Sequence, residues 1–206
     1  MIKRIGLALI GLCLLIWNLH IANGQAVSEL LQNPYFTSYY GIGGPNVVPV
    51  GWKLTSSIPV STASHAYRDD GPVEFPGQPR DGQAWEIHAT SAVFTAIAYQ
   101  QVPGVPAGTK LHFTVWGNVY TCNRTTSCIE NGRPYRLSDQ SSGARERIGI
   151  DPNGGTDANA SSIQWSSFLS PFDVYQQLSV DATAAGSNGV TVYLYATQSM
   201  GMLLNF

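Results

Sequence analysis

The sequence predicts an all-β fold, built as a two-sheet β-sandwich. From Val27 onward, short runs of alternating apolar and polar residues recur between clusters of Gly, Pro, Asn and Asp, and no long stretch repeats apolar residues at the 3.6 spacing of a helix. The clearest run begins at Lys110, and its two faces carry Leu111, Phe113 and Val115 on one side and His112, Thr114 and Trp116 on the other. Strands with one apolar face bury it against a second sheet.

The first element in chain order is a secretory leader. Lys3 and Arg4 precede an apolar run from Ile5 to Ile16, and small residues follow up to Ala26. We expect residues 1–26 to be a signal peptide, cleaved after Gly24 or Ala26, and 27–206 to form one secreted, extracellular domain. A membrane anchor is the alternative, but about 12 to 17 apolar residues fall short of the roughly 20 that span a bilayer. We therefore expect no membrane partner after cleavage.

Eight strands are expected in the mature chain. They are short runs of alternating residues between clusters of Gly, Pro, Asn and Asp. The expected strands are Glu29 to Leu31, Trp52 to Ser56, Ala84 to His88, Val93 to Val102, Lys110 to Tyr120, Arg145 to Ile150, Val174 to Val180 and Val190 to Thr197. A last short apolar run covers Met202 to Phe206.

The connections have their own signals. The Pro- and Gly-rich turn between Val102 and Lys110 predicts a hairpin joining the two flanking strands. Four prolines within Ser57 to Asp81 predict a long surface loop, and Thr121 to Gly143 is a second polar loop. The pair Gly154 and Gly155 predicts a tight turn with positive φ.

The chain resembles the galactose-binding-like jelly rolls that include many bacterial carbohydrate-binding modules. The pieces that carry the resemblance, in this order, are ELLQNPYF, PVGW, the segment YQQVPGVPAGTKLHFTVW, RIGIDPNGGTDA and VTVYLYATQ. The resemblance implies a jelly roll whose partner is a polysaccharide or glycan, without catalysis. Relatives hold a calcium ion through an acidic residue after the opening Phe and an Asp in the closing strand. Thr37 follows Phe36 here, and no closing Asp is present, so we expect no metal site or a weak one. No cofactor is expected.

The resemblance also bears on the C-terminal run. In relatives the last strand continues beyond the stretch that corresponds to Met202–Phe206. A domain lacking its closing strand would keep an open sheet edge, and such edges invite self-association. The sequence leaves open whether the domain is complete.

Charge and cysteine content narrow the partners further. The chain has 11 basic and 13 acidic residues, and loss of Lys3 and Arg4 brings the net charge to about −4 with no basic cluster, so nucleic acid is not an expected partner. Two cysteines of an exported domain, Cys122 and Cys128, are expected to form a disulfide. Two free thiols are the alternative, and without a neighbouring His they offer too few ligands for zinc.

Candidate glycan-binding residues are aromatic side chains on the polar faces of strands, together with polar neighbours. Aromatic rings stack on the apolar side of a pyranose, and amides, carboxylates and hydroxyls bond its hydroxyl groups. The candidates are Trp116 and His112 on one strand, Tyr193 and Tyr195 on another, and Tyr175 and Gln177 on a third. If these faces line one surface, they form a stacking platform.

Each aromatic also has a structural interpretation. Trp52 and Trp85 fit core positions, Trp165 fits packing or a rim contact equally well, and Trp116, Tyr193 and Tyr195 would also serve to cover a sheet. The spacing of Asp151 and Asp157 resembles a calcium loop but lacks the closing Glu of an EF-hand, so a strand-connecting turn is favoured over a ligand-facing loop.

The sequence does not favour an enzyme. A glycosidase needs two carboxyl groups placed across a sugar bond, and the spacing of Glu74, Glu86, Glu130 and Asp151 pairs none of them. The rival functions are a structural or interaction module of the cell surface, without a sugar site, and a small hydrolase. The sequence names neither the glycan nor the oligomeric state.

Overall fold

The computed structural model describes residues 29–44, 46–66, 83–89, 92–122, 129–130, 133–134, 138–186, 188–199 and 203–205. The chain divides into two compact units, Met1–Leu30 and Leu31–Phe206. The fold is that of the second unit. The expected signal segment lies outside the described residues, and so do the side chain of Cys122 and the whole of Cys128, whose disulfide stays a prediction.

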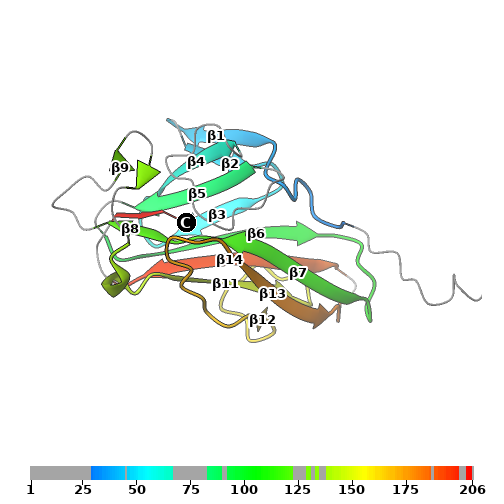
Figure 1. The fold of residues 1–206 in the computed structure, drawn as a ribbon. Helices are drawn as coiled ribbons and strands as arrows, with labels where there is room; N and C mark the ends of the chain where they lie inside the picture. The colour runs from blue at the N-terminus through cyan, green and yellow to red at the C-terminus, as the bar shows by residue number, and fades with distance from the viewer. Residues whose placement is uncertain are drawn as a thin grey trace, which may run out of the picture. The chain divides into compact units, whose positions relative to one another are not determined.

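One layer of the fold is a five-stranded antiparallel sheet. Its order is β12 (Gln164–Trp165), β11 (Arg145–Asp151), β14 (Val190–Gln198), β6 (Phe94–Val102) and β3 (Lys53–Ser56). Strand β14 lies at the centre, between β11 and β6 (Figure 1). Its β-branched and aromatic residues suit a strand that is paired along both edges.

The other layer consists of two shorter sheets. Strand β7 (Lys110–Gly117) pairs with β13 (Gln176–Thr183), and β8 (Tyr120–Cys122) follows β7 after two residues. The second of these sheets has the order β4 (Ser61–Ala66), β5 (Gln83–Ala89), β15 (Leu203–Asn205) and β8. The predicted all-β sandwich is therefore confirmed.

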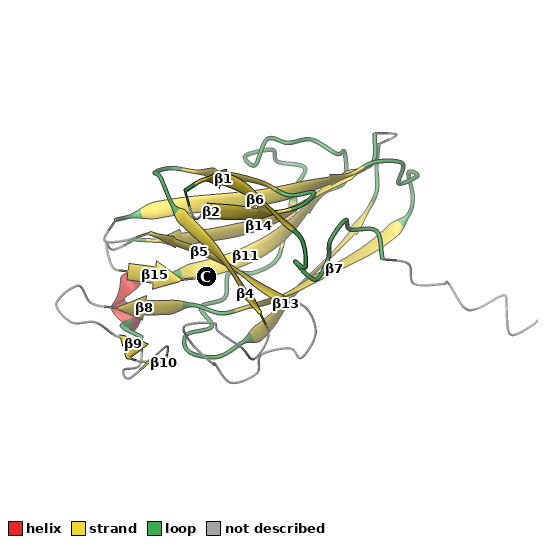
Figure 2. Cartoon of the chain, turned by 90° about the horizontal axis from the view of Figure 1, so that it is seen from above, coloured by secondary structure: helices red, strands yellow, loops and turns green. Residues whose placement is uncertain are grey.

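Small elements complete the described part of the unit. Strands β1 (Tyr39–Gly43) and β2 (Asn46–Pro49) form one hairpin, and β9 (Ile129–Glu130) and β10 (Arg133–Pro134) form another. A 3₁₀ helix, η1 (Gln140–Ser142), is the helical element among the described residues, and Figure 2 shows how short it is beside the strands.

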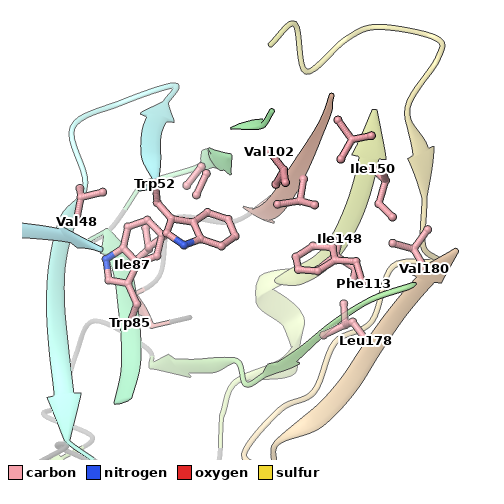
Figure 3. Packing of buried hydrophobic residues seen from close by; sticks show 14 of the residues in the cluster. Val48, Trp52, Trp85, Ile87, Val102, Phe113, Ile148, Ile150, Leu178 and Val180 are labelled. Atoms are coloured by element: carbon pink, nitrogen blue, oxygen red, sulfur yellow. The ribbon is translucent and has the colours of Figure 1, made fainter. Parts of the chain in front are cut away.

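The core fills the space between the layers. Ile148 and Ile150 on β11 face Phe113 on β7 and Leu178 and Val180 on β13, as Figure 3 shows. All five side chains are at most 8% exposed. This burial confirms the predicted inner face of β7, where Leu111 and Val115 also pack against the core.

Two tryptophans lie at the other end of the core. Trp52 is 2% exposed and Trp85 is 8% exposed, which confirms both as core residues. Phe36 lies against both rings, with its centroid 5.8 Å from that of Trp52 and 6.2 Å from that of Trp85. Burying a large aromatic contributes about 1.5–3 kcal/mol, so this cluster fixes the opening segment on the sandwich.

The expected hairpin between Val102 and Lys110 is wrong. Strand β6 pairs with β14 and β3, whereas β7 pairs with β13, so the turn carries the chain from one layer to the other. Residues of the turn bond to the segment after β13 instead, where Gly108 N–H donates to the Ala184 carbonyl oxygen at 2.7 Å. Alternation of residues determines which face of a strand is buried, but not which strand pairs with it.

The expected strand at Glu29 to Leu31 is also wrong, since the described backbone there is irregular. Strands β1, β2, β4, β9, β10 and β12 were not expected. Strand β4 lies within the expected loop Ser57 to Asp81, and the loop's residues 67–81 lie outside the described residues. The sequence STASHA of β4 has small and polar side chains, so it gives no apolar alternation to recognise.

The C-terminal run does not form an open edge. Leu204 pairs with Ala89 of β5 on one side and with Thr121 of β8 on the other. The described strand β15, Leu203–Asn205, is therefore paired along both sides, and self-association of the protein stays a prediction.

Asp151 ends β11 and organises the turn that follows. Its Oδ1 and Oδ2 atoms accept hydrogen bonds from the N–H groups of Asn153 and Gly155, both at 3.0 Å, and the residue is 1% exposed. Gly154 has φ +72°, as its position in the turn predicts. The strand-connecting turn was thus the correct interpretation.

Candidate functional site

Three of the six predicted site residues lie together on the exposed side of β7 and β13. Trp116 lies directly opposite Gln177 in the antiparallel register, and His112 lies opposite Asp181. We call the part of this surface from the Trp116–Gln177 pair to the His112–Asp181 pair the β7–β13 face; its six side chains, all exposed, are His112, Thr114, Trp116, Gln177, Ser179 and Asp181, and the exposed pair Lys110 and Thr183 lies next to it.

The β7–β13 face has one aromatic side chain at one end and a charged pair at the other. Trp116 is 44% exposed. His112 Nδ1 lies 2.7 Å from Asp181 Oδ1, which fixes the orientation of the imidazole ring. Directly opposed residues place their Cβ atoms about 4.5–5.5 Å apart. Each opposed pair of β7 and β13 residues therefore presents two adjacent side chains to a ligand.

Sequence reasoning placed Thr114 on this face without counting it as a site residue, and it missed Ser179 and Asp181. The alternation Gln177, Ser179, Asp181 was available as a signal, because every second residue of a strand faces the same side. The register that places Asp181 beside His112 was not available, because it depends on the pairing of two strands whose facing residues are 69 positions apart.

Tyr193 and Tyr195 do not share a surface with Trp116, contrary to the predicted platform. Both lie on the outer side of the five-stranded sheet, whereas Trp116 belongs to the other layer. Tyr193 is 0% exposed, and its hydroxyl donates to the Gly155 carbonyl oxygen at 2.7 Å. Burial raises the pKa of Tyr193 to about 12. Its ring is closed to a ligand in this structure.

Trp165 covers Tyr193. The centroid of the Trp165 ring lies 5.8 Å from those of both Tyr193 and Tyr195. Gly149 makes this packing possible, because a Cβ at that position would lie 2.6 Å from Trp165 Cε3. Of the two interpretations of Trp165, packing is the one that the structure shows.

Cationic side chains lie over the remaining rings on this sheet. The guanidinium carbon of Arg147 lies 4.1 Å from the ring centroid of Trp165, 4.5 Å from that of Phe168 and 4.7 Å from that of Tyr195. Arg145 lies 4.3 Å from the centroid of Phe168. We call this surface the aromatic–cation face; its residues are Lys53, Tyr99, Arg145, Arg147, Trp165, Phe168 and Tyr195.

Arg147 is the most enclosed of these cations. Desolvation lowers the pKa of its guanidinium group. Its Nε atom is buried and finds no hydrogen-bond partner among the described residues. Stacking on aromatic faces is a typical environment for arginine, whose planar cation is attracted to the ring quadrupole.

Tyr175 lies just before the paired part of β13 and does not belong to the β7–β13 face as defined. It precedes β13, is half-buried, and burial raises its pKa to about 12, with smaller contributions from the charges of Glu146 and Glu86. The Oε1 atom of Glu146 is sealed from solvent, and burial raises the pKa of this carboxyl group to about 8. The Tyr175 hydroxyl is therefore partly buried and interacts electrostatically with the carboxyl groups of Glu146 and Glu86.

The described residues hold neither a cluster of metal ligands nor a membrane-spanning helix. No three His, Cys, Asp or Glu side chains gather there as a possible metal-ligand set. No helix in that part of the chain has the length and apolar character needed to cross a membrane.

No protein-family model matches the chain, and no curated protein matches it. Several solved structures resemble it at low sequence identity, including the following three. The first is TmCBM61 in complex with beta-1,4-galactotriose, with 10% identity, a TM-score of 0.46, and coverage of 87% of this chain and 94% of that one.

The other two likenesses span a small part of longer proteins. One is the enzymatically active domain of bacteriophage CBA120 tailspike protein 4, with 8% identity, a TM-score of 0.45, and coverage of 76% of this chain and 18% of that one. The other is the Clostridium thermocellum xylanase 10B fragment with CBM22-1 and GH10 modules, complexed with xylohexaose, with 10% identity, a TM-score of 0.39, and coverage of 76% and 25%.

Proposed function

We propose that the protein is a secreted, noncatalytic glycan-binding protein and that the β7–β13 face is its binding surface. The observation that carries the proposal is the exposed ring of Trp116, placed in register beside the amide of Gln177. An exposed aromatic with polar neighbours matches the two sides of a pyranose, one apolar and one rich in hydroxyls.

The neighbouring side chains supply the hydrogen bonds. Gln177 offers a carbonyl oxygen and an amide NH₂, and the hydroxyls of Thr114 and Ser179 both donate and accept. When His112 donates its Nδ1–H to Asp181, its Nε2 atom becomes an acceptor for a sugar hydroxyl. The face thus recognises hydroxyl groups without needing a charged ligand.

Binding without hydrolysis fits the charges on this face. Hydrolysis of a glycosidic bond ordinarily needs two carboxyl groups on opposite sides of the bond. Among the six described side chains of the β7–β13 face, Asp181 is the one carboxylate, and it is held by His112.

A glycan array screened with the mature protein tests the proposal, followed by calorimetry on the best ligand with Trp116→Ala and Gln177→Ala. Tyr35→Ala is the matched control, since Tyr35 is an exposed aromatic, 54% exposed, outside the β7–β13 face. We expect binding that is lost in Trp116→Ala and kept in Tyr35→Ala. If no glycan binds, or if Trp116→Ala binds as well as the wild type, a structural role at the cell surface replaces this proposal.

A further inference from the structure

We propose that the aromatic–cation face is a second binding site, selective for acidic saccharides such as uronic acid oligomers. It lies on the other layer of the sandwich from the β7–β13 face and does not depend on it. The inference starts from three cations that share one side of the five-stranded sheet: Lys53, Arg145 and Arg147.

These cations lack carboxylate partners within the described part of the chain. The ion pairs among the described residues join histidines to acids, and none involves Lys53, Arg145 or Arg147. Asp151 and Asp157 act electrostatically on Tyr193 from the same side of the sheet, but their carboxylates accept hydrogen bonds from backbone N–H groups of their own loops. Among the described residues, no carboxylate therefore neutralises the three cations.

The rings hold the cations in defined positions. Arg147 is enclosed by three rings, Arg145 lies over Phe168, and the Lys53 Nζ atom lies 5.6 Å from the centroid of Tyr99. Guanidinium groups bind carboxylates and other oxyanions through two parallel hydrogen bonds, and a guanidinium already fixed by stacking loses less freedom when it does so. Arg145 and Arg147 are two residues apart on one strand, so their backbones are about 7 Å apart.

The surface between the cations suits a sugar. Tyr99 lies between Lys53 on β3 and Tyr193 on β14 in the register, and the half-exposed Ile97 lies beside Tyr195. Lys53 is three strands away from β11, a span of roughly 14 Å at about 4.8 Å per strand. A chain of sugar rings crossing the strands would thus meet aromatic surface between its charged groups.

Nucleic acid is a poorer fit to the same face. Its binding rests on neutralising many phosphates, typically with about six or more contacts, and this face offers three cations. The whole chain carries a formal net charge of −2, which disfavours a long polyanion but leaves a local cationic surface available.

The test compares oligogalacturonate with a neutral galactose oligomer of equal length, by calorimetry on the mature protein at low ionic strength. We expect the acidic oligomer to bind this face and the neutral one to bind it much more weakly. Arg145→Gln and Lys53→Gln should each lower the affinity for the acidic oligomer by about 2- to 5-fold, as loss of one exposed ion pair does. Arg147→Gln should lower the affinity for the acidic oligomer further. If its melting temperature also falls, lost packing contributes to the effect; if the melting temperature is unchanged, the effect is on binding alone.

Matched controls separate this proposal from the glycan-binding function of the β7–β13 face. Trp116→Ala should leave oligogalacturonate binding intact, and Arg145→Gln should leave binding to the glycan selected on the array intact. Equal affinity for the neutral and acidic oligomers would overturn the proposal. So would unchanged binding in both Arg145→Gln and Lys53→Gln, or equal competition by single-stranded DNA, which would mark a general polyanion surface.

Discussion

The Oε1 atom of Glu146 occupies the space in which a Cβ at Gly117 would stand. Strands β11 and β7 belong to different layers, so this contact reaches across the interior of the sandwich. The Oε1 atom has no hydrogen-bond partner among the described residues, and burial raises the pKa of the carboxyl group to about 8. Glu146 is therefore held in its neutral form at neutral pH.

Stability should fall as pH rises from about 5 to about 8, because of Glu146. The unfolded chain loses this proton near 4.5, the ordinary pKa of a glutamate side chain, whereas the folded protein keeps it up to a pKa of about 8. In that interval the folded state binds more protons, which gives a slope of up to about 1.4 kcal/mol per pH unit. Urea denaturation across this pH range should show the slope reduced in Glu146→Gln. Parallel pH profiles for the two proteins would show that Glu146 is not the cause.

Gly117→Ala should destabilise the fold by roughly 1–3 kcal/mol, since the added methyl group overlaps the Glu146 carboxyl group. The cost should shrink in a Glu146→Ala background, because the conflicting atoms are removed. A double-mutant cycle in urea measures this coupling. Additive effects would contradict the contact.

Gly149→Ala should disturb the packing of Trp165, whose Cε3 atom lies 2.6 Å from the added Cβ. We expect a lower melting temperature and changed tryptophan fluorescence. Gly41→Ala is the control, because the nearest atom to its added Cβ would be the Asn46 carbonyl oxygen, at 4.0 Å. Equal effects of the two changes would mean that Trp165 does not depend on Gly149.

Asp151→Ala should cost about 1–3 kcal/mol, because it leaves two N–H groups of the turn without acceptors. Asp157→Ala should cost less, since Asp157 is exposed and accepts a local bond from Asn159 N–H. Chemical denaturation compares the two. Adding calcium to the wild type is a separate measurement. A change in stability would indicate that the protein binds calcium, which the Asp151→Ala and Asp157→Ala variants alone do not test.

Changes at exposed and at buried aromatic residues should differ in what they damage. Trp116→Ala should weaken glycan binding by on the order of 1–3 kcal/mol and leave the melting temperature unchanged, because the ring is outside the core. Phe113→Ala should cost about 3–5 kcal/mol of stability. Tyr193→Ala should also lower stability, because the ring is buried under Trp165. A melting temperature lowered equally by Trp116→Ala and Phe113→Ala would remove Trp116 from the proposed site.

The sequence correctly predicted which face of a strand is buried, but not which other segments of the chain the strand contacts. The alternation around Phe113 correctly placed Trp116 outside and Phe113 inside, because side-chain direction follows from the local backbone. Tyr193 also lies on the outer side, as expected, but Trp165 covers it. That contact joins a short strand to the centre of the sheet, and no local pattern encodes it. The same limit explains the mistaken hairpin, since pairing is decided by packing between distant segments.

The central ladder of the five-stranded sheet has a consequence for how the chain folds. The hydroxyls of Thr95 on β6 and Thr197 on β14 lie 3.0 Å apart although the residues are 102 positions apart in sequence. The chain must close a loop of that length before these strands can pair, and closure costs entropy before any contact compensates for it. Folding is therefore expected on the millisecond-to-second timescale typical of non-local β topologies, with the edges of β6 and β14 open to other chains until they meet.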